Sequence, residues 1–454
     1  MNGYLIAGVL VAIIVLLLAT NKKLVETVKN MYKIEELRKR IFYTIGLLLV
    51  YRLGCFVVIP GINPNMLGAE SALANQMDSN ALLGLLDVFS GGAFANAAIF
   101  ALGVMPYITA SIVVQLLQMD IVPYFTELSK QGQTGRNKIN QITRVLGIVL
   151  AFIQGYMFSF AFMPNGSVMD YMEVSLVLTA GTSLLLWIGD QITMKGLGNG
   201  ISMIIMAGIL TSTPYMFSEA WKTLVDLATT QTIFLGVISF MVFVLVYVGV
   251  ILGVLYIQLA ERRVPVQYAN KTSNSISGKQ TYMPFRLNSA GVIPVIFASA
   301  LISVPALIAQ FSKNDAWMVF VNKWLSLNSI TGFILFLIFI VLFSFFYTFV
   351  TIKPKELSEN LQKNGGYIPG VRPGKETEEY VSKVLNRITV VGSVFLALVA
   401  GLPYVFGAIT TLPTTVRIGG TGLIIVVTVI LEAYKQLESN IISRSYKSRR
   451  RHRA

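Results

Sequence analysis

The chain has very little of the chemistry that metal sites and hydrolytic enzymes need. Among its 454 residues there is one cysteine, Cys55, and one histidine, His452. A single cysteine excludes an intrachain disulfide and a cysteine metal cluster. A single histidine, placed in the C-terminal tail, excludes a histidine-ligated metal site or a Ser-His-Asp triad inside an apolar span. We therefore predict no catalytic residue, no metal ligand and no cofactor.

The sequence also lacks a nucleotide-binding motif. The stretch 370–375 (GVRPGK) has three residues between its glycines instead of four, and Glu376 follows where a phosphate loop needs Ser or Thr. The stretch 196–200 (GLGNG) lacks the spacing and the preceding strand of a dinucleotide fingerprint. Energy for any transport must then come from a partner or a gradient.

Charged residues are scarce, at 13% of the chain, whereas 54% of the residues are hydrophobic. A soluble protein carries about 25% charged residues. The repeated apolar runs indicate a polytopic, all-α membrane protein. The net charge of +14 indicates basic cytoplasmic loops rather than a nucleic-acid-binding domain.

The apolar runs predict eleven membrane spans. They cover 3–20, 41–59, 97–119, 143–163, 172–190, 199–217, 232–257, 288–311, 330–351, 387–407 and 419–437. Alternate connections hold 31 of the 36 basic residues. By the positive-inside rule these connections and the C-terminus are cytoplasmic.

After the first span, ten spans divide into two groups of five. We predict an N-terminal half at 22–217 and a C-terminal half at 232–438, with an external hinge loop at 218–231 and a basic cytoplasmic tail at 439–454. Because five is odd, the halves have opposite orientations, and inverted repeats place a pathway at their interface. Secondary transporters share this symmetry, so it does not select a function.

The first segment, 1–21, is hydrophobic but lacks the basic start of a signal peptide. It is either a genuine extra helix with an external N-terminus, or an upstream start or fusion artefact.

One apolar stretch is too short to span a bilayer. Leu82–Phe89 is followed by Gly91-Gly92 and then by the run AFANAAIFALGVMPYITASIVVQLL. A spanning helix takes about 20 apolar residues. A half-helix that enters a span through glycines predicts a re-entrant element, which is tolerated only where it packs in protein or lines an aqueous cavity.

The amino-acid sequences of several stretches resemble the SecY family, the pore-forming subunits of the bacterial protein-export channel. The most specific are 89–117, 261–269, 288–298, 365–377 and 419–427. The resemblance implies a ten-helix core with a re-entrant plug at 82–94, which includes Leu85, Phe89, Ser90, Gly91 and Gly92. It also implies a mid-membrane ring of aliphatic side chains, at Val104, Ile108, Ile205, Ile293, Ile296 and Ile425. Thr109 and Val304 match facing positions of a lateral gate toward lipid.

The resemblance implies partners as well. Arg262, Arg263 and Arg372 match basic positions on paired cytoplasmic loops that receive the ribosome or the SecA motor ATPase. SecE-like and SecG-like subunits, SecDF, a YidC-like insertase and secretory polypeptides complete the expected partners. The implied function is to conduct unfolded proteins across the bacterial plasma (inner) membrane and to release transmembrane segments sideways into lipid.

Each of these interpretations has an alternative. The aliphatic positions could belong to ordinary helix packing or face lipid, the half-helix could cover some other pore, and the basic loops could only mark topology and contact headgroups. Two rival functions are a secondary transporter and an intramembrane protease or insertase. The spans carry almost no ionisable groups, which disfavours both: Arg52, Asp190 and Glu432 lie near span ends, where snorkelling or capping accounts for them.

Three positions depart from the family pattern. Met194 replaces an acid of a cytoplasmic charge pair, Thr428 replaces an aliphatic residue near the pore, and Asn96-Ala97 replaces a more polar or basic pair after the plug.

Overall fold

The computed structural model describes residues 34–62, 81–118, 122–163, 166–225, 230–268, 281–311, 315–327, 329–410 and 422–438. The expected extra helix at 3–20 and the basic tail lie outside these ranges. The chain forms two compact units, one of Met1–Tyr247 with Pro403–Ala454 and one of Val248–Leu402. The two units are defined by which residues pack together, whereas the predicted halves are defined by the order of spans in the sequence. The units therefore do not test the halves, which stay a prediction.

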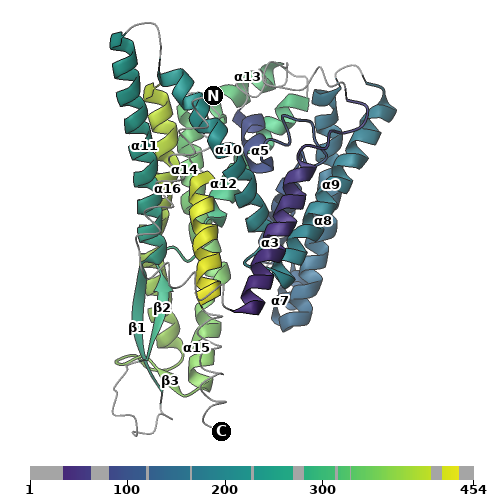
Figure 1. Ribbon diagram of the computed structural model, residues 1–454. Coiled ribbons are helices and arrows are strands. Elements are labelled where there is room, and N and C mark those ends of the chain that lie inside the picture. Colours follow the sequence, from purple (N-terminus) through teal and green to yellow (C-terminus); the bar gives the residue numbers. More distant parts are fainter. Residues whose placement is uncertain are drawn as a thin grey trace. The chain divides into compact units, whose positions relative to one another are not determined.

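The named secondary-structure elements of the first unit, where it is described, are all helices (Figure 1). Its helices are α3 (Glu35–Gly54), α5 (Ala81–Ser90), α6 (Met105–Leu117), α7 (Pro123–Lys130), α8 (Gly132–Phe162), α9 (Val168–Lys195), α10 (Gly200–Leu224), the first part of α11 (Thr230–Leu259) and a helix over 422–438.

Local signals in the sequence set the starts of α9 and α10. Ser167 and Asp170 form a capping box, in which each side chain accepts a hydrogen bond from the other's backbone N–H. The Asn199 side chain accepts from the N–H groups of Ile201 and Ser202. The stretch GLGNG is therefore a helix-entry loop.

The connection between α10 and α11 is shorter than the expected loop 218–231, because α10 continues to Leu224. Aromatic rings hold the two helices together: Phe217 packs on Phe243 at 5.7 Å between ring centroids, and Trp221 on Phe240 at 4.9 Å. These residues form a buried cluster with Met216, Ala220 and Val225.

The second unit combines membrane-type helices with a small sheet. Its helices are α12 (Ile293–Phe311), α13 (Asp315–Trp324), α14 (Ile330–Thr351), α15 (Pro354–Lys363) and the part of α16 (Lys375–Thr410) up to Leu402, together with the end of α11. Phe297 on α12 meets Phe343 on α14 edge to face, at 5.8 Å. Helix α12 contains Pro305, and α14 carries no charged residue.

The sheet has the order β2-β1-β3 and is antiparallel. Its strands are β1 (Glu261–Tyr268), β2 (Thr281–Arg286) and β3 (Gly366–Tyr367). Buried Val264 and Val266 alternate with exposed neighbours on β1, and they pack on Leu361 of α15 and Leu385 of α16. The alternation explains this local exception to the all-α prediction, because period two suits a strand with one buried face.

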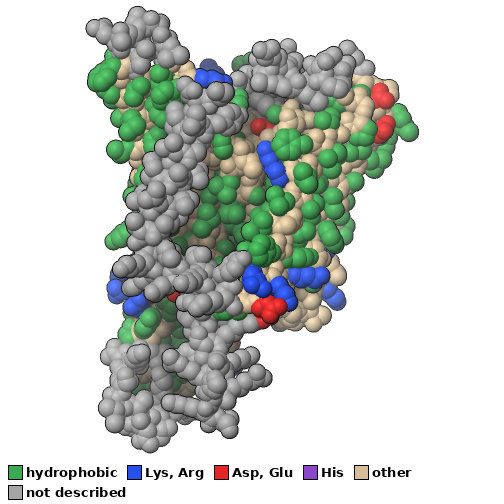
Figure 2. Space-filling view, viewed as in Figure 1, with side chains coloured by type: hydrophobic (Ala, Val, Ile, Leu, Met, Phe, Trp, Pro, Cys, Tyr) green, Lys and Arg blue, Asp and Glu red, His purple; other side chains and the backbone are tan. Residues whose placement is uncertain are grey.

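Six helices in the described residues are long and apolar enough to cross a membrane. Five lie within α8, α9, α10, α11 and α16, and the sixth, Ile330–Lys363, covers α14 and α15. Hydrophobic side chains cover the flanks of the helices in Figure 2, while Lys and Arg gather toward the ends. In lipid, an apolar flank is the favourable surface, so the chain is a multi-pass membrane protein.

The expected span 97–119 is only partly helical. Helix α6 covers Met105–Leu117, and residues 91–104 form a series of turns. Pro106 at the start of α6 and the positive-φ residues Gly91, Gly92, Ala97 and Gly103 account for the irregular backbone, since such conformations do not continue a helix.

The buried contacts of the sheet predict a stability effect. Replacing Leu385, which is fully buried against β1, by alanine should destabilise this part of the protein by about 2–5 kcal/mol, because it leaves a cavity. Hydrogen exchange of the β1 and β2 amides measures the effect. The matched control is Asn386→Ala, an exposed position on the same helix. Equal exchange in the two variants would contradict the assigned core.

Candidate functional site

The half-helix α5 ends in a glycine turn. Gly92 N–H donates to the carbonyl of Asp87 at 2.9 Å, and Gly91 N–H to that of Val88 at 3.3 Å. Both glycines have positive φ, +70° and +83°, which favours residues without a Cβ. The sequence prediction of a short helix that stops at these glycines is confirmed. Phe89, Ser90 and Gly91 are buried, and Gly92 is half-buried.

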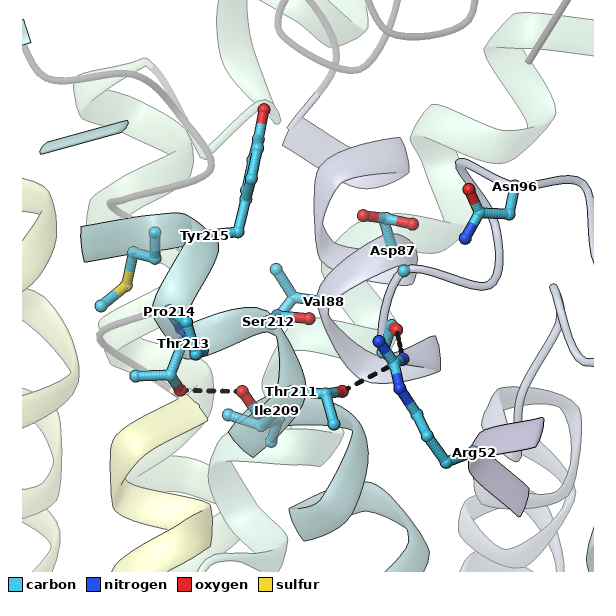
Figure 3. Close-up of a pocket in the computed structure, with 13 residues that line it drawn as sticks. Arg52, Asp87, Val88, Asn96, Ile209, Thr211, Ser212, Thr213, Pro214 and Tyr215 are labelled. Atoms are coloured by element: carbon cyan, nitrogen blue, oxygen red, sulfur yellow. Dashed lines mark hydrogen bonds between the residues drawn. The ribbon is translucent and has the colours of Figure 1, made fainter. Parts of the chain in front are cut away.

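Two carbonyls at the end of α5, those of Ser90 and Gly91, accept hydrogen bonds from α3. The hydroxyl of Tyr51 donates to the Ser90 carbonyl at 2.9 Å. The Arg52 guanidinium donates to the Gly91 carbonyl at 2.6 Å and to the hydroxyl of Thr211 on α10 at 3.5 Å. Figure 3 shows Arg52 extending from α3 toward the turn after α5. Arg52 is therefore engaged with the half-helix, which the snorkelling interpretation of this residue did not anticipate.

Helix α10 packs directly against the same turn, backbone to backbone. A Cβ on Gly208 would lie 2.6 Å from the Phe89 carbonyl oxygen and 3.0 Å from the Tyr51 hydroxyl oxygen. A Cβ on Gly91 would lie 2.9 Å from the Gly208 Cα. Only glycine fits this close approach between α5 and α10.

The irregular stretch after α5 is held by its own chain and by the segment after α3. The Asp87 carboxylate accepts from the Ala95 N–H at 2.9 Å, and the Ser90 hydroxyl from the Phe94 N–H at 3.1 Å. Ile59 N–H donates to the Ala97 carbonyl at 3.0 Å, and Ile99 N–H to the Val57 carbonyl at 2.9 Å. Re-entrant backbone is thus satisfied by protein, as the sequence prediction required.

The aliphatic positions expected to form a ring are buried, with one exception. Val104, Ile108, Ile205 and Ile425, all in the first unit, are 2, 8, 4 and 1% exposed, and Ile296 in the second unit is 9% exposed. Ile293 is half-buried. On the same helices, Val113 and Leu210 are exposed as lipid-facing residues would be. Burial disfavours the lipid-facing alternative for five of these positions.

The remaining expected site residues are divided between the units. Thr109 lies on α6 of the first unit, where its hydroxyl donates to the Met105 carbonyl at 3.1 Å, and Val304 is an exposed residue on α12 of the second. Their pairing stays a prediction. Leu85 lies on α5, as expected.

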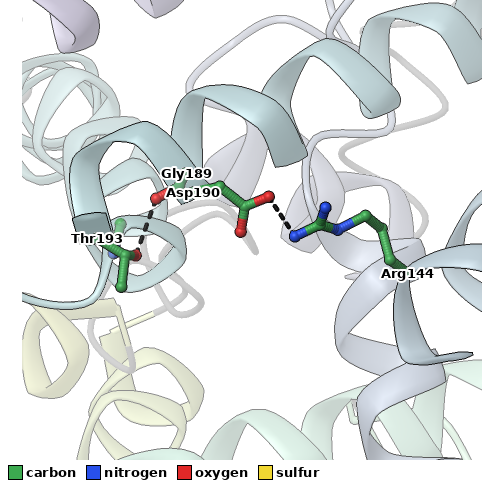
Figure 4. A network of polar contacts seen from close by, with 5 residues as sticks. Arg144, Gly189, Asp190 and Thr193 are labelled. Carbon is green, nitrogen blue, oxygen red and sulfur yellow. Dashed lines mark hydrogen bonds and ion pairs between the residues drawn. The ribbon is translucent and has the colours of Figure 1, made fainter. Parts of the chain in front are cut away.

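Asp190 near the end of α9 pairs with Arg144 on α8 (Figure 4). In the next turn, the Thr193 hydroxyl donates to the Gly189 carbonyl at 2.9 Å and accepts from the Gly200 N–H at 2.8 Å. The pair and the threonine connect α8, α9 and α10. Met194, the expected departure from the family pattern, is exposed.

The three basic residues expected at a partner surface are exposed and belong to the second unit. Arg262 and Arg263 lie on β1; Arg263 Nε is 2.8 Å from a Glu261 carboxylate oxygen, and its guanidinium lies 4.7 Å from the centre of the Tyr282 ring. The hydrogen bond to Glu261 raises the pKa of Arg263, as do the charges of Tyr282 and Glu261. Arg372 follows β3, and its side chain is 87% exposed. Pairing of β1 with β3 brings the two predicted loops into one folded layer.

Comparison with known proteins decides the family. The SecY family model matches residues 98–434. "Protein translocase subunit SecY" of Halalkalibacterium halodurans is 43% identical over 434 residues, which are 93% of this chain and 98% of that protein. The protein of the same name from Staphylococcus aureus is 42% identical over 434 residues, which are 93% and 99% of the two chains. The chain belongs to the SecY family.

Solved structures agree on the fold. One described as "The structure of a protein conducting channel" superposes with a TM-score of 0.60 and 19% identity, over 89% of this chain and 93% of that one. "Sec61 in the Canine ribosome-channel complex from the endoplasmic reticulum" gives 0.58 and 18%, over 89% and 93%. By its sequence relatives, this SecY-family chain is a protein translocase subunit, a transport protein. Within the described residues, no group of three His, Cys, Asp or Glu side chains could hold a metal ion.

The glycine contact between α5 and α10 predicts that overpacking displaces the half-helix. Gly208→Ala should weaken the packing of α5 against α10 by about 1–3 kcal/mol, because the new methyl group meets the Phe89 carbonyl. Buried Cys55, whose thiol lies 3.6 Å from the Ser90 carbonyl oxygen, reports the change. Its labelling by a water-soluble maleimide should become roughly 5- to 150-fold faster.

The control for this experiment is Gly46→Ala on α3, where a Cβ has open space. If Gly208→Ala and Gly46→Ala label at the wild-type rate, the close approach does not restrain α5.

Proposed function

We propose that this SecY-family channel closes with two barriers, a ring of aliphatic side chains and a plug made by residues 82–94. The observation that carries the proposal is the burial of an uncharged, aliphatic set at positions from four separate helices. A hydrophobic constriction seals by dewetting and has no preference for a particular sequence, which suits a conduit for many polypeptides.

The plug assignment is supported by the contacts that hold α5 in the first unit. The turn after this half-helix is bound by α3 and α10 through hydrogen bonds and glycine contacts, so it has a defined position from which it can be withdrawn. One of the similar solved structures is described as "The plug domain of the SecY protein stablizes the closed state of the translocation channel and maintains a membrane seal". It is 18% identical and has a TM-score of 0.60.

We propose further that Thr109 and Val304 lie on the two edges of a lateral gate. A transmembrane segment is more stable in lipid than in water, and a charge at the bilayer centre adds about 2.5–3.5 kcal/mol to its insertion cost. A slit between pore and lipid can separate secreted from inserted segments by that difference.

The proposed partner surface is the layer formed by β1, β2 and the chain after β3, with Arg262, Arg263 and Arg372. It is supported by two similar structures, described as complexes of such channels with ribosomes. A planar guanidinium group can bind a phosphate or a carboxylate through two hydrogen bonds at once. This geometry suits both the phosphates of ribosomal RNA and the carboxylates of an acidic motor surface. SecA, SecE-like and SecG-like subunits, SecDF and a YidC-like insertase stay predictions, as do the bacterial inner membrane and the cytoplasmic C-terminus.

A crosslinking experiment tests the pore ring. In a Cys55→Ala background, Ile296→Cys should form a disulfide with a cysteine in a stalled secretory chain, because the chain must pass this side chain. The control Ile340→Cys is fully buried on α14, outside the expected ring. Crosslinking at 340 but not at 296 in an engaged complex would overturn the pore assignment.

A second pair of cysteines tests the lateral gate. In the same background, Thr109→Cys with Val304→Cys should form a disulfide under oxidation, since a disulfide requires Cα atoms within about 7 Å. Insertion of transmembrane segments should then fall at least about tenfold and recover with reductant. Each single-cysteine variant serves as a control. Unimpaired insertion with the bond fully formed would refute the gate.

A further inference from the structure

Two neighbouring residues at the end of α3 make hydrogen bonds to two neighbouring carbonyls at the end of α5. We propose that Tyr51 and Arg52 are a latch: they are positioning residues that set how readily the plug leaves its closed position. This inference rests on the proposed role of residues 82–94 as a plug. It assigns the control of that plug to side chains of a different helix.

The chemistry of a helix end explains why these donors are suited to the task. The last carbonyls of a helix have no partner within it and carry a partial negative charge. The Tyr51 hydroxyl binds the Ser90 carbonyl at 2.9 Å, and the Arg52 guanidinium binds the Gly91 carbonyl at 2.6 Å. Because the acceptors are backbone groups, the latch does not depend on which side chains the plug carries.

Two contacts besides the Gly91 carbonyl hold the guanidinium in place. It lies 4.6 Å from the centre of the Phe56 ring, and it also donates to Thr211 on α10 at 3.5 Å. Tyr51 is 1% exposed, and its ring stacks on Phe100 at 6.0 Å. Both donors are therefore oriented by surroundings that remain when α5 is absent.

A pocket beside the latch makes it reversible. It has a volume of about 360 Å³ and is lined by Arg52, Asp87, Asn96, Thr211 and Ser212, among others (Figure 3). Such a volume holds several waters, and the polar groups give them partners. When the plug leaves, water can replace the carbonyl at the guanidinium, so the bonds bias the closed state without locking it.

The test measures channel opening in the reconstituted translocase without substrate. Tyr51→Phe removes only one hydroxyl and should raise the open fraction about fivefold, the effect of one neutral hydrogen bond. Arg52→Gln removes the charge and should raise it about tenfold or more. Arg52→Lys keeps a cationic donor and should restore part of the closure. Ion conductance across a planar bilayer reports the open fraction.

Matched controls remove similar interactions that do not touch the plug. Tyr43→Phe deletes a hydroxyl on the same helix that donates to Gln191 on α9 at 3.2 Å. Arg144→Gln breaks the ion pair with Asp190. Both should conduct like the wild type. If they leak as much as Tyr51→Phe and Arg52→Gln, the effect is a general loss of stability and the latch is wrong.

Cys55 supplies an independent readout that a general loosening would not reproduce. It is the chain's single cysteine, it is fully buried, and its thiol lies against the Ser90 carbonyl. Maleimide labelling of Cys55 should accelerate in the latch variants by the same factor as the conductance. Increased conductance with unchanged labelling would overturn the latch, because the plug would not have moved.

A deletion of residues 82–90 separates failure of the latch from failure of the plug. If the deletion does not raise conductance, the plug proposal itself fails. If the deletion opens the channel while Tyr51→Phe and Arg52→Gln do not, only the latch fails. If the latch holds, these substitutions have no further effect in the deleted background.

Discussion

The structure of the first unit depends on one constraint: backbone that is not helical must find its hydrogen-bond partners in protein where lipid surrounds it. Residues 91–104 meet this constraint stepwise. Their N–H groups bind carbonyls and side chains of α5, such as Asp87, and the extended segment after α3, at Val57. The carbonyls at 90 and 91 accept from Tyr51 and Arg52. Each unpaired group would cost several kcal/mol in an apolar medium, so the irregular stretch and its partners must form together.

Glycine provides the space for this arrangement. A Cβ on Gly181 of α9 would lie 2.0 Å from the Ile99 carbonyl oxygen, and one on Gly54 of α3 would lie 2.0 Å from the Phe100 ring. With Gly208 of α10, three helices each present a bare backbone to the same buried stretch. Close approach without side chains is the usual means of packing helices in membranes, where burial of apolar surface adds no driving force. Here it accommodates an irregular segment instead of another helix.

The sequence predicts what depends on local pattern. The spans follow from apolar runs, and the end of α5 follows from Gly91-Gly92, since both features act within one element. Tyr51, Arg52 and Asp87 are different. Arg52 looks like a snorkelling residue because its partner, the Gly91 carbonyl, is 39 residues away and carries no side-chain signal. The strand β3 is likewise hard to predict, since it has two residues and its partner β1 lies about 100 residues earlier. The proposed ring, which includes Val104 and Ile205, rests on family resemblance, because the sequence alone does not distinguish a buried aliphatic residue in a pore from one in a helix contact.

A gate that opens for a passing polypeptide needs a closed state that is favoured by little. If only apolar packing held the plug, its release would cost about 25 cal/mol for each Å² of apolar surface exposed to water. The cost would therefore rise with every apolar side chain that contacts the plug. Hydrogen bonds to carbonyls behave differently, because water replaces them and leaves a net effect near 1 kcal/mol each. The polar pocket that contains Arg52 and Asp87 is what makes that exchange available at the turn. If residues 82–94 act as the proposed plug, a few backbone hydrogen bonds beside a small polar pocket give it a weak, reversible preference for the closed position.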